Sequence, residues 1–342
     1  MEKIKINMLS SALKVKGQGV GSAFLEQVGL VSSDDLFDVA INSKKKGFDI
    51  YHHHTIDYYF KFRKKGIHVV YVHFLPNTLN GSIKLNCLFS KIFKSYVKRY
   101  YKKADEIVVV NPIYINELME LGIKRDKITY IPNYVSSENF YSKTIKEVDE
   151  IKEKYDIPKD KFVVLGVGQV QTRKGVKDFI EVAKIMPDMY FVWAGGFSFG
   201  AITDGYKELT QIVKNPPKNV KFLGIVDRLN MNDIYNLCDV LFVPSYNELF
   251  PMSILEAVCV NKPILLRNLE LYEDILFDEY LRGDDNEDFC NKLFNLKNDF
   301  KIYKDAEEKS LRLSKFYSPK YVLNLWVKYY QEIVEKYKNV SL

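Results

Sequence analysis

The chain has 342 residues, which is long enough for two domains of ordinary size. Its composition, 47% hydrophobic and 27% charged, is typical of a globular protein and excludes disordered and fibrous classes. No segment approaches the roughly 20 apolar residues of a membrane span. The N-terminal run MEKIKINMLSS lacks the apolar stretch of a signal peptide. Four isolated cysteines predict reduced thiols in a cytosolic setting: Cys87, Cys238, Cys259 and Cys290.

The net charge of +6 is unevenly distributed. Residues 1–140 contain 21 Lys and Arg against 13 Asp and Glu, a net charge of +8. The remaining residues contain 29 against 31, a net charge of −2. A basic first half suits nucleic acid, phosphate-bearing substrates or anionic lipid, and charge alone does not choose among these partners.

Short apolar, β-branched runs alternate with helical patterns along the chain. The runs in the first part are Ile4–Leu9, Asp49–His52, Val69–His73 and Glu106–Val110. Later runs are Phe162–Gly168, Tyr190–Ala194, Val220–Val226, Val240–Pro244 and Pro263–Leu266, separated by helical patterns at Lys177–Met186, Asp204–Val213, Met231–Cys238 and Met252–Val260. Continuous apolar strands between helices predict parallel sheets covered on both faces. The pattern occurs twice, so we expect an α/β protein with two doubly wound, Rossmann-like domains.

The break between these domains falls after Ile131-Pro-Asn-Tyr134, where a polar segment without a strand pattern begins at Ser136 and extends to Lys161. We expect an N-terminal domain at residues 1–145 and a C-terminal domain at residues 146–320. Residues 321–342 hold an amphipathic helical pattern, Tyr321–Tyr337, rich in Tyr, Trp and Val. We expect this helix to dock back across the domain junction.

A glycine-rich segment, Gly17-Gln-Gly19-Val-Gly21, follows the first strand. Its glycines would let backbone N–H groups approach a phosphate closely, which makes Gly17 and Gly19 candidates for binding a diphosphate. The spacing differs from the dinucleotide-binding fingerprint. A plain flexible loop is an equally good interpretation.

Four histidines stand at the ends of two predicted strands: His52, His53, His54 and His73. In a parallel sheet these ends share the edge where ligands bind. No acid or cysteine stands at zinc-ligand spacing, so we favour His73 as a hydrogen-bonding partner of a substrate hydroxyl over a metal site. No D-x-D triplet is present for Mg²⁺ or Mn²⁺, and we predict no metal cofactor.

Residues 91–103, KIFKSYVKRYYKK, form a basic amphipathic pattern. On a helix, one half would carry Ile92, Phe93, Tyr96, Val97, Tyr100 and Tyr101, and the other Lys91, Lys94, Lys98, Arg99, Lys102 and Lys103. Such a helix suits an anionic membrane interface. It equally suits packing on the domain's own sheet with solvated bases. A mixed arrangement, with the bases resting on lipid head groups, satisfies both hypotheses.

The segment Gly166–Gly175 follows one strand and precedes a helix, which places Arg173 and Lys174 where a diphosphate would meet the helix N-terminus. The segment does not match the P-loop motif, because Gly175 rather than Ser or Thr follows Lys174. A turn with solvated bases is the alternative.

The most informative motif joins Glu248 and Glu256, in the run Glu248-Leu-Phe-Pro-Met-Ser-Ile-Leu-Glu256. It follows a predicted buried strand and opens a helix near Met252, whose free N–H groups favour an anion. Glu248 falls in the loop where ligands of open α/β sheets bind. Glu256 lies about one turn into the helix, where its carboxylate could accept hydrogen bonds from both hydroxyls of a ribose. Two isolated glutamates would more often be a surface residue and a helix-capping residue. The Phe-Pro turn directly after a buried strand favours a ligand-binding site instead.

These motifs, in this order over nearly the whole chain, resemble the family 4 retaining glycosyltransferases of the GT-B type, whose two domains face a cleft. The E-x7-E element is the most specific part, and Ala-Gly-Gly196, Phe-Leu-Gly224 and Pro-Ser245 also match. The resemblance implies that Glu256 binds the nucleotide ribose and that residues around Val226 contact the base. It implies that Lys174 and the N–H groups of Phe250, Met252 and Ser253 face the diphosphate and sugar. It places Glu248 and His73 beside the donor sugar.

Two positions depart from the family pattern. Gln169 stands where the family usually has a phosphate-binding arginine, which Arg173 would have to replace. Pro251 replaces the second glycine of the usual E-G-F-G form. The segments GQGVGSA, GQVQTRKG and WAGGFSFGAITDGY are most similar to Gram-positive α-galactosyl-glucosyl-diacylglycerol synthases.

That similarity implies UDP-galactose or UDP-glucose as donor and a glucosyl-diacylglycerol as acceptor. The reaction would take place on the inner face of the cell membrane, with Phe93 and the bases of residues 91–103 at the acceptor and lipid. Three alternatives stay open at this stage. They are a transferase acting on a soluble polysaccharide or capsule acceptor, a nucleotide-sugar epimerase of the same fold, and a non-catalytic phosphate- or nucleic-acid-binding protein. The charge of −2 beyond residue 140 offers no continuing basic track for the last.

Overall fold

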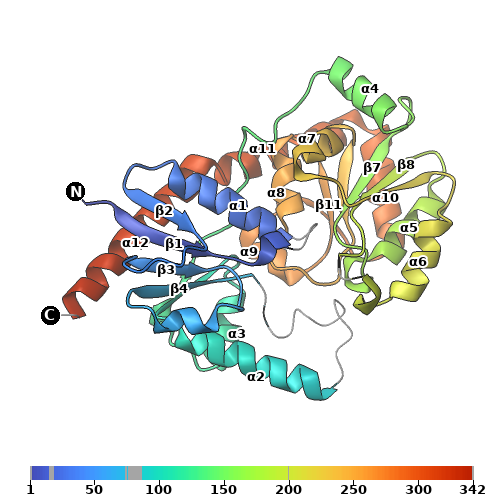
Figure 1. Ribbon diagram of the computed structural model, residues 1–342. Helices are drawn as coiled ribbons and strands as arrows, with labels where there is room; N and C mark the ends of the chain where they lie inside the picture. Colours follow the sequence, from blue (N-terminus) through green and yellow to red (C-terminus); the bar gives the residue numbers. More distant parts are fainter. Residues whose placement is uncertain (1, 15–18, 74, 76–86, 199, 341–342) are drawn as a thin grey trace.

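The computed structural model describes residues 2–14, 19–73, 75, 87–198 and 200–340 (Figure 1). Within these residues, each half of the chain forms a six-stranded sheet whose neighbouring strands pair in parallel. The N-terminal sheet has the order β2-β1-β3-β4-β5-β6 and the C-terminal sheet the order β12-β11-β10-β7-β8-β9. The prediction of two doubly wound α/β domains is therefore confirmed.

The strands of the N-terminal sheet are β1 (Ile4–Leu9), β2 (Phe37–Ile41), β3 (Ile50–His53), β4 (Ile67–Val72), β5 (Glu106–Val109) and β6 (Ile128–Tyr130). Its helices are α1 (Gly19–Ser32), α2 (Cys87–Lys103) and α3 (Tyr114–Glu120). Alternate residues of a strand point to opposite faces. Thus Val70 and Val72 pack against Val97 of α2, while Val69 packs in the cluster that contains Phe24 of α1.

The strands of the C-terminal sheet are β7 (Val163–Val167), β8 (Tyr190–Ala194), β9 (Val220–Gly224), β10 (Val240–Val243), β11 (Ile264–Arg267) and β12 (Leu281–Gly283). Its helices are α4 (Ile145–Lys154), α5 (Val176–Ile185), α6 (Tyr206–Lys214), α7 (Arg228–Asn236), α8 (Met252–Cys259), α9 (Glu273–Leu276), α10 (Asn286–Asn298) and α11 (Phe300–Phe316). Residues of α5 and α10 share one buried cluster with one face of the sheet, and residues of α7 and α8 share another with the opposite face.

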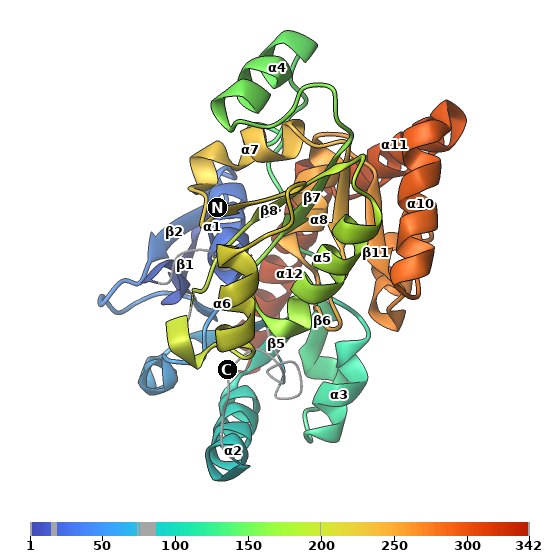
Figure 2. The same ribbon diagram turned by 90° about the vertical axis from the view of Figure 1, so that its right-hand side faces the viewer.

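The last helix, α12 (Pro319–Val340), returns to the N-terminal half, where it runs beside α1 (Figures 1 and 2). The Tyr330 hydroxyl hydrogen-bonds Nδ1 of buried His52 at 2.7 Å, and Lys336 Nζ lies 2.5 Å from Glu106 Oε1. The prediction that a C-terminal helix crosses back is confirmed.

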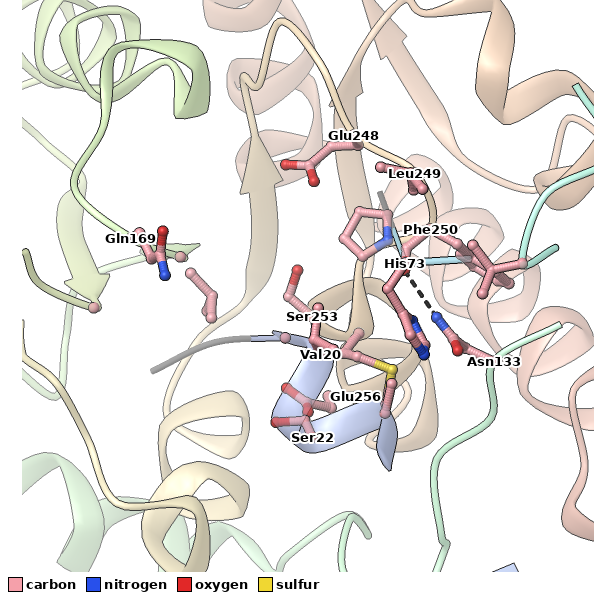
Figure 3. A pocket seen from close by; sticks show the side chains of 18 of the residues that line it. Val20, Ser22, His73, Asn133, Gln169, Glu248, Leu249, Phe250, Ser253 and Glu256 are labelled. Carbon is pink, nitrogen blue, oxygen red and sulfur yellow. Dashed lines mark hydrogen bonds between the residues drawn. The ribbon is translucent and has the colours of Figure 1, made fainter. Parts of the chain in front are cut away.

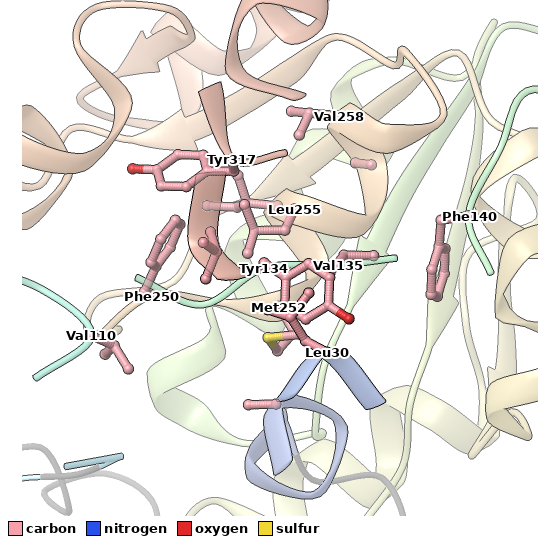
Figure 4. Packing of buried hydrophobic residues seen from close by; sticks show 14 of the residues in the cluster. Leu30, Val110, Tyr134, Val135, Phe140, Phe250, Met252, Leu255, Val258 and Tyr317 are labelled. Carbon is pink, nitrogen blue, oxygen red and sulfur yellow. The ribbon is translucent and has the colours of Figure 1, made fainter. Parts of the chain in front are cut away.

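The two halves share one continuous buried cluster (Figure 4). Leu30 of α1 and Tyr134 of the connecting segment pack there with Met252 and Leu255 of α8. The domain boundaries at residues 145 and 320 stay predictions.

The sequence patterns missed several short or exposed elements. The edge strands β2 and β12 and the three-residue strand β6 were not predicted, and neither were α10 and α11. The polar segment Ser136–Lys161 contains α4, which begins with a capping box formed by Thr144 and Glu147.

Candidate functional site

A cavity of about 660 Å³ lies between the two halves (Figure 3). Its walls are the carboxyl ends of strands from both sheets and the first turns of α1 and α8, represented by Ser11, His73, Gly168, Gly19 and Ser253. This is the edge at which open α/β sheets bind ligands.

Three charged side chains meet on the C-terminal side of this cavity. Lys174 Nζ lies 2.5 Å from Glu248 Oε1, and Arg173 Nη1 lies 3.8 Å from Glu248 Oε2. Arg173 also donates a hydrogen bond of 2.8 Å to the Asn247 carbonyl. Burial works against ionisation of Glu248, which is 5% exposed, but Lys174 and Arg173 hold its pKa below the usual range. Glu248 is therefore a buried carboxylate beside two cations.

Gly175 brings the two basic residues to this position. Its φ of 67° lies in the left-handed region, and a Cβ there would stand 2.3 Å from the Pro244 carbonyl oxygen. A glycine lets the chain turn tightly against the end of β10. The turn also places the Arg173 carbonyl where it accepts a 2.8 Å hydrogen bond from the Tyr246 N–H.

The helix α8 begins at the cavity wall. Its N-cap is Pro251, and no side-chain hydrogen bond caps it among the described residues. Phe250, Met252 and Ser253 all line the cavity. An uncapped helix start carries partial positive charge and favours an anion. In Figure 3, Ser253 lies between Glu248 and Glu256.

Glu256 lies one turn further along α8 and is 4% exposed. Its Oε1 accepts a hydrogen bond of 2.8 Å from Arg228 Nη1, and its Oε2 accepts one of 2.6 Å from the Tyr235 hydroxyl. Arg228 Nη2 also pairs with Glu26 of α1. Burial works against the charge of Arg228, yet Glu256 and Glu26 raise its pKa above the ordinary value. Val226 lines the cavity beside this group.

Side chains of the N-terminal half hold the loop that carries Glu248. The Tyr114 hydroxyl donates to the Glu248 carbonyl at 2.6 Å. Asn111 Nδ2 donates to the Leu249 carbonyl at 3.1 Å, and Asn133 Nδ2 donates to the Phe250 carbonyl at 3.2 Å (Figure 3). The loop between β10 and α8 is thus fixed from across the junction.

Two histidines line the opposite wall. His54 follows β3 and His73 follows β4, and His54 Nδ1 lies 3.2 Å from His73 Nε2. Burial lowers the pKa of His73 to about 3 and that of His54 well below its usual value. Both rings are therefore neutral near pH 7. His52 and His53 are buried within β3, and no group of three or more His, Cys, Asp or Glu suited to a metal occurs in the described part of the chain.

The helix α2 packs one side on the N-terminal sheet and exposes most of its bases, while contact of those bases with lipid head groups stays a prediction. Val97, Tyr100 and Tyr101 are buried against the N-terminal sheet, while Ile92 is 58% exposed and Phe93 lines the cavity. Lys94 is partly buried, and the exposed bases are Lys91, Lys98, Arg99, Lys102 and Lys103. Among the described residues, none of the helices combines the length and apolar character that crossing a bilayer requires.

The structure thus brings together most of the predicted site residues. Those that line the cavity are Gly19, His73, Phe93, Arg173, Lys174, Val226, Glu248, Phe250, Met252, Ser253 and Glu256. Gly17 lies outside the described residues. No site role was predicted for Arg228, Asp57 or Asn133, while His54 was considered only as one of the four histidines at the strand ends and Gln169 only as a departure from the family pattern; all five line the cavity.

Comparisons with known proteins agree with this architecture. Residues 147–308 match the family Glycosyl transferases group 1, and residues 29–139 match Glycosyltransferase Family 4. The chain is 42% identical to an alpha-galactosylglucosyldiacylglycerol synthase of Streptococcus pneumoniae, over 97% of this chain and 90% of that protein. It is 30% identical to a processive diacylglycerol alpha-glucosyltransferase of Acholeplasma laidlawii, over 80% of this chain and 82% of that one.

Solved structures share the fold at low identity. The Anabaena HepE protein in complex with UDP-glucose superposes with a TM-score of 0.78 at 14% identity, covering 96% of this chain and 99% of that one. A sucrose-phosphate synthase of Thermosynechococcus elongatus gives a TM-score of 0.78 at 15% identity, covering 98% and 100%. With two parallel sheets facing one cavity and a relative 42% identical over almost its full length, the chain belongs to the family 4 glycosyltransferases of the GT-B fold.

Proposed function

We propose that this protein moves a hexose, galactose rather than glucose, from a UDP-sugar to a glucosyl-diacylglycerol, with retention of the anomeric configuration. The observation that carries the proposal is the pairing of two buried carboxylates, Glu248 and Glu256, on either side of an uncapped helix start beside Lys174. The names of the two lipid-glycosylating relatives support the acceptor class. The name of the Streptococcus protein supports galactose.

The donor occupies the C-terminal wall of the cavity. Lys174, Arg173 and the start of α8 bind the diphosphate, because they bring cations and N–H groups to one point. Glu256 accepts hydrogen bonds from the ribose hydroxyls, and Val226 packs beside the base. Gln169, which stands where the family usually has a phosphate-binding arginine, lines the cavity without a charge. Arg173 supplies the missing positive charge at the diphosphate.

The N-terminal wall faces the reacting carbon. Gly19, at the first turn of α1, brings backbone N–H groups toward the diphosphate. Neutral His73 on this wall and Glu248 on the C-terminal wall bind hydroxyls of the donor hexose. A neutral imidazole donates and accepts hydrogen bonds without adding charge next to the developing cationic sugar.

In the reaction, the bond between the anomeric carbon and the β-phosphate oxygen breaks as the acceptor oxygen bonds to that carbon on the same face. The acceptor hydroxyl proton passes to the departing β-phosphate oxygen, so no protein base is required. Lys174, Arg173 and the α8 N-terminus stabilise the charge that develops on UDP. Since protein cations fill this role, the proposal predicts full activity in excess EDTA.

The acceptor approaches from the N-terminal half, whose residues 1–140 carry the net charge of +8. Phe93 lines the cavity, and four exposed bases follow it along α2: Lys98, Arg99, Lys102 and Lys103. These bases rest on anionic head groups at the inner face of the cell membrane, so that only the sugar of the glycolipid enters the cavity.

The decisive experiment incubates the protein with liposomes that contain monoglucosyl-diacylglycerol and either UDP-galactose or UDP-glucose. Mass spectrometry and NMR then identify the lipid product and its anomeric configuration. We expect an α-linked galactosyl product. Glycosylation of a water-soluble sugar alone would instead support a polysaccharide enzyme. Conversion of the UDP-sugar without acceptor would support an epimerase.

A further inference from the structure

Arg228 joins the two halves of the molecule through a single guanidinium group. Its Nη1 donates to Glu256 of α8 at 2.8 Å, and its Nη2 pairs with Glu26 of α1. Both carboxylates are only 4% exposed. The planar guanidinium can serve two carboxylates at once because its donors form a fixed fork. Lysine, with a single point charge, has no such geometry.

The partners of this fork are themselves held in place. Glu26 Oε2 accepts a hydrogen bond of 3.0 Å from the Ser136 N–H, and Glu256 Oε2 accepts from the Tyr235 hydroxyl. The Arg228 guanidinium carbon lies 5.2 Å from the Phe140 ring centroid, so the ring adds a cation–π contact to the fork. The arrangement therefore defines one orientation of the Glu256 carboxylate.

Glu26 and Glu256 differ in their relation to the cavity. Glu256 and Arg228 line it, whereas Glu26 does not. The first turn of the same helix α1, with Gly19, Val20 and Ser22, forms part of the cavity wall. The chain Glu256–Arg228–Glu26 thus connects the ribose side of the cavity with the helix that supplies its opposite wall.

We propose that Arg228 is a positioning residue that orients Glu256 for the ribose hydroxyls and, through Glu26, couples ribose binding to the placement of α1. This inference rests on the ribose role proposed above for Glu256. It assigns a function to Glu26, which reaches the nucleotide only through Arg228. The carboxylate of Glu256 keeps lone pairs for ribose hydroxyls, since each oxygen carries two.

Isothermal titration calorimetry with UDP and with 2′,3′-dideoxy-UDP tests the proposal. Arg228→Met should weaken UDP binding about tenfold or more, because the ribose loses hydrogen bonds to a charged group. The same change should alter dideoxy-UDP binding less than about twofold, since that ligand has no ribose hydroxyls. A structural role, or direct contact of Arg228 with the diphosphate, would weaken both ligands equally and would overturn the proposal.

Glu26→Gln keeps the volume and one acceptor for the Ser136 N–H, so it tests the coupling without a cavity. It should weaken UDP binding several-fold in the wild-type background and have no further effect in Arg228→Met. Independent effects that add in the double variant would refute the coupling. The matched control is Arg312→Met, because Arg312 forms a similar fork with Glu279 on the exposed surface of α11, away from the cavity.

The ligand pair also separates this inference from the proposed function. If wild-type protein binds UDP and dideoxy-UDP equally, or binds neither, the ribose site itself is wrong. If Glu256→Gln weakens the binding of UDP but not of dideoxy-UDP, the ribose site is supported. If Arg228→Met then leaves UDP binding unchanged, the positioning role of Arg228 is refuted.

Discussion

Replacing Lys174 by methionine separates the charge of this side chain from its packing. The Lys174 side chain is 14% exposed and its ammonium lies 2.5 Å from Glu248 Oε1. In the proposed reaction this ammonium faces the β-phosphate as negative charge develops there. Loss of one preorganised donor at such a point costs roughly 3 kcal/mol, or two to three orders of magnitude in kcat.

The same substitution also leaves Glu248 as a buried carboxylate whose remaining cation, Arg173, stands 3.8 Å away. Removing one partner of a buried pair destabilises a protein by about 3 kcal/mol. Since Arg173 retains part of the interaction with Glu248, we expect Lys174→Met to lower the free energy of unfolding by about 2 kcal/mol. The double variant Lys174→Met/Glu248→Gln removes both charges and should recover most of that stability while remaining inactive.

Single-turnover transfer from radiolabelled UDP-galactose measures the chemical step, and guanidinium unfolding measures stability. Lys221→Met is the control, because Lys221 donates to the Tyr155 carbonyl at 2.7 Å far from the cavity. The reasoning is refuted if Lys174→Met retains its rate within about threefold, a loss of less than 1 kcal/mol. It is equally refuted if the double variant is less stable than the single one.

Three further changes test other parts of the structure. Gly175→Ala forces a Cβ to 2.3 Å from the Pro244 carbonyl oxygen and should lower the free energy of unfolding by about 2 kcal/mol or more, measured by urea denaturation. Lys98→Glu combined with Arg99→Glu should weaken cosedimentation with anionic vesicles by at least tenfold at low salt, at about 1 kcal/mol per charge lost, and high salt should abolish the difference. The lowered pKa values of His52 and His73, both about 3, mean that the unfolded chain binds more protons below pH of about 6.5. Stability should therefore fall as pH decreases from about 6.5 toward 3, by up to about 1.4 kcal/mol per pH unit per histidine, and His52→Phe should flatten that slope.

Local chemistry made the C-terminal wall of the cavity predictable. Glu248, Glu256 and the Arg173–Lys174 pair each lie where a buried strand gives way to a helix, and both features are visible in short windows of sequence. Parallel strands bring such points to one edge, so the fold class alone places them near one another. The strands β1 and β8 were predicted with their observed bounds for the same reason.

The parts that escaped prediction depend on contacts between distant positions. Arg228 and Glu26 are 202 residues apart, and neither stands in a recognisable motif. Asn111 and Tyr114 donate hydrogen bonds to backbone carbonyl groups of the loop that carries Glu248. Every residue has such a carbonyl, so no residue type in the loop marks these contacts. In the edge strand β2 only Phe37 is fully buried, and β12 has only three residues. Such elements are set by neighbouring structure rather than by their own pattern.

The return of α12 to the N-terminal half has a consequence for how this protein emerges from the ribosome. Trp326 and Tyr330 are buried beside His52 and Tyr71, which belong to strands made 255 to 278 residues earlier. The interior of the first sheet is therefore closed only once α12 has been made, whereas the later sheet has its own cover from α5 and α10. A stalled or truncated chain would expose the β3–β4 surface to chaperones and proteases, even though every residue of the first sheet had been made.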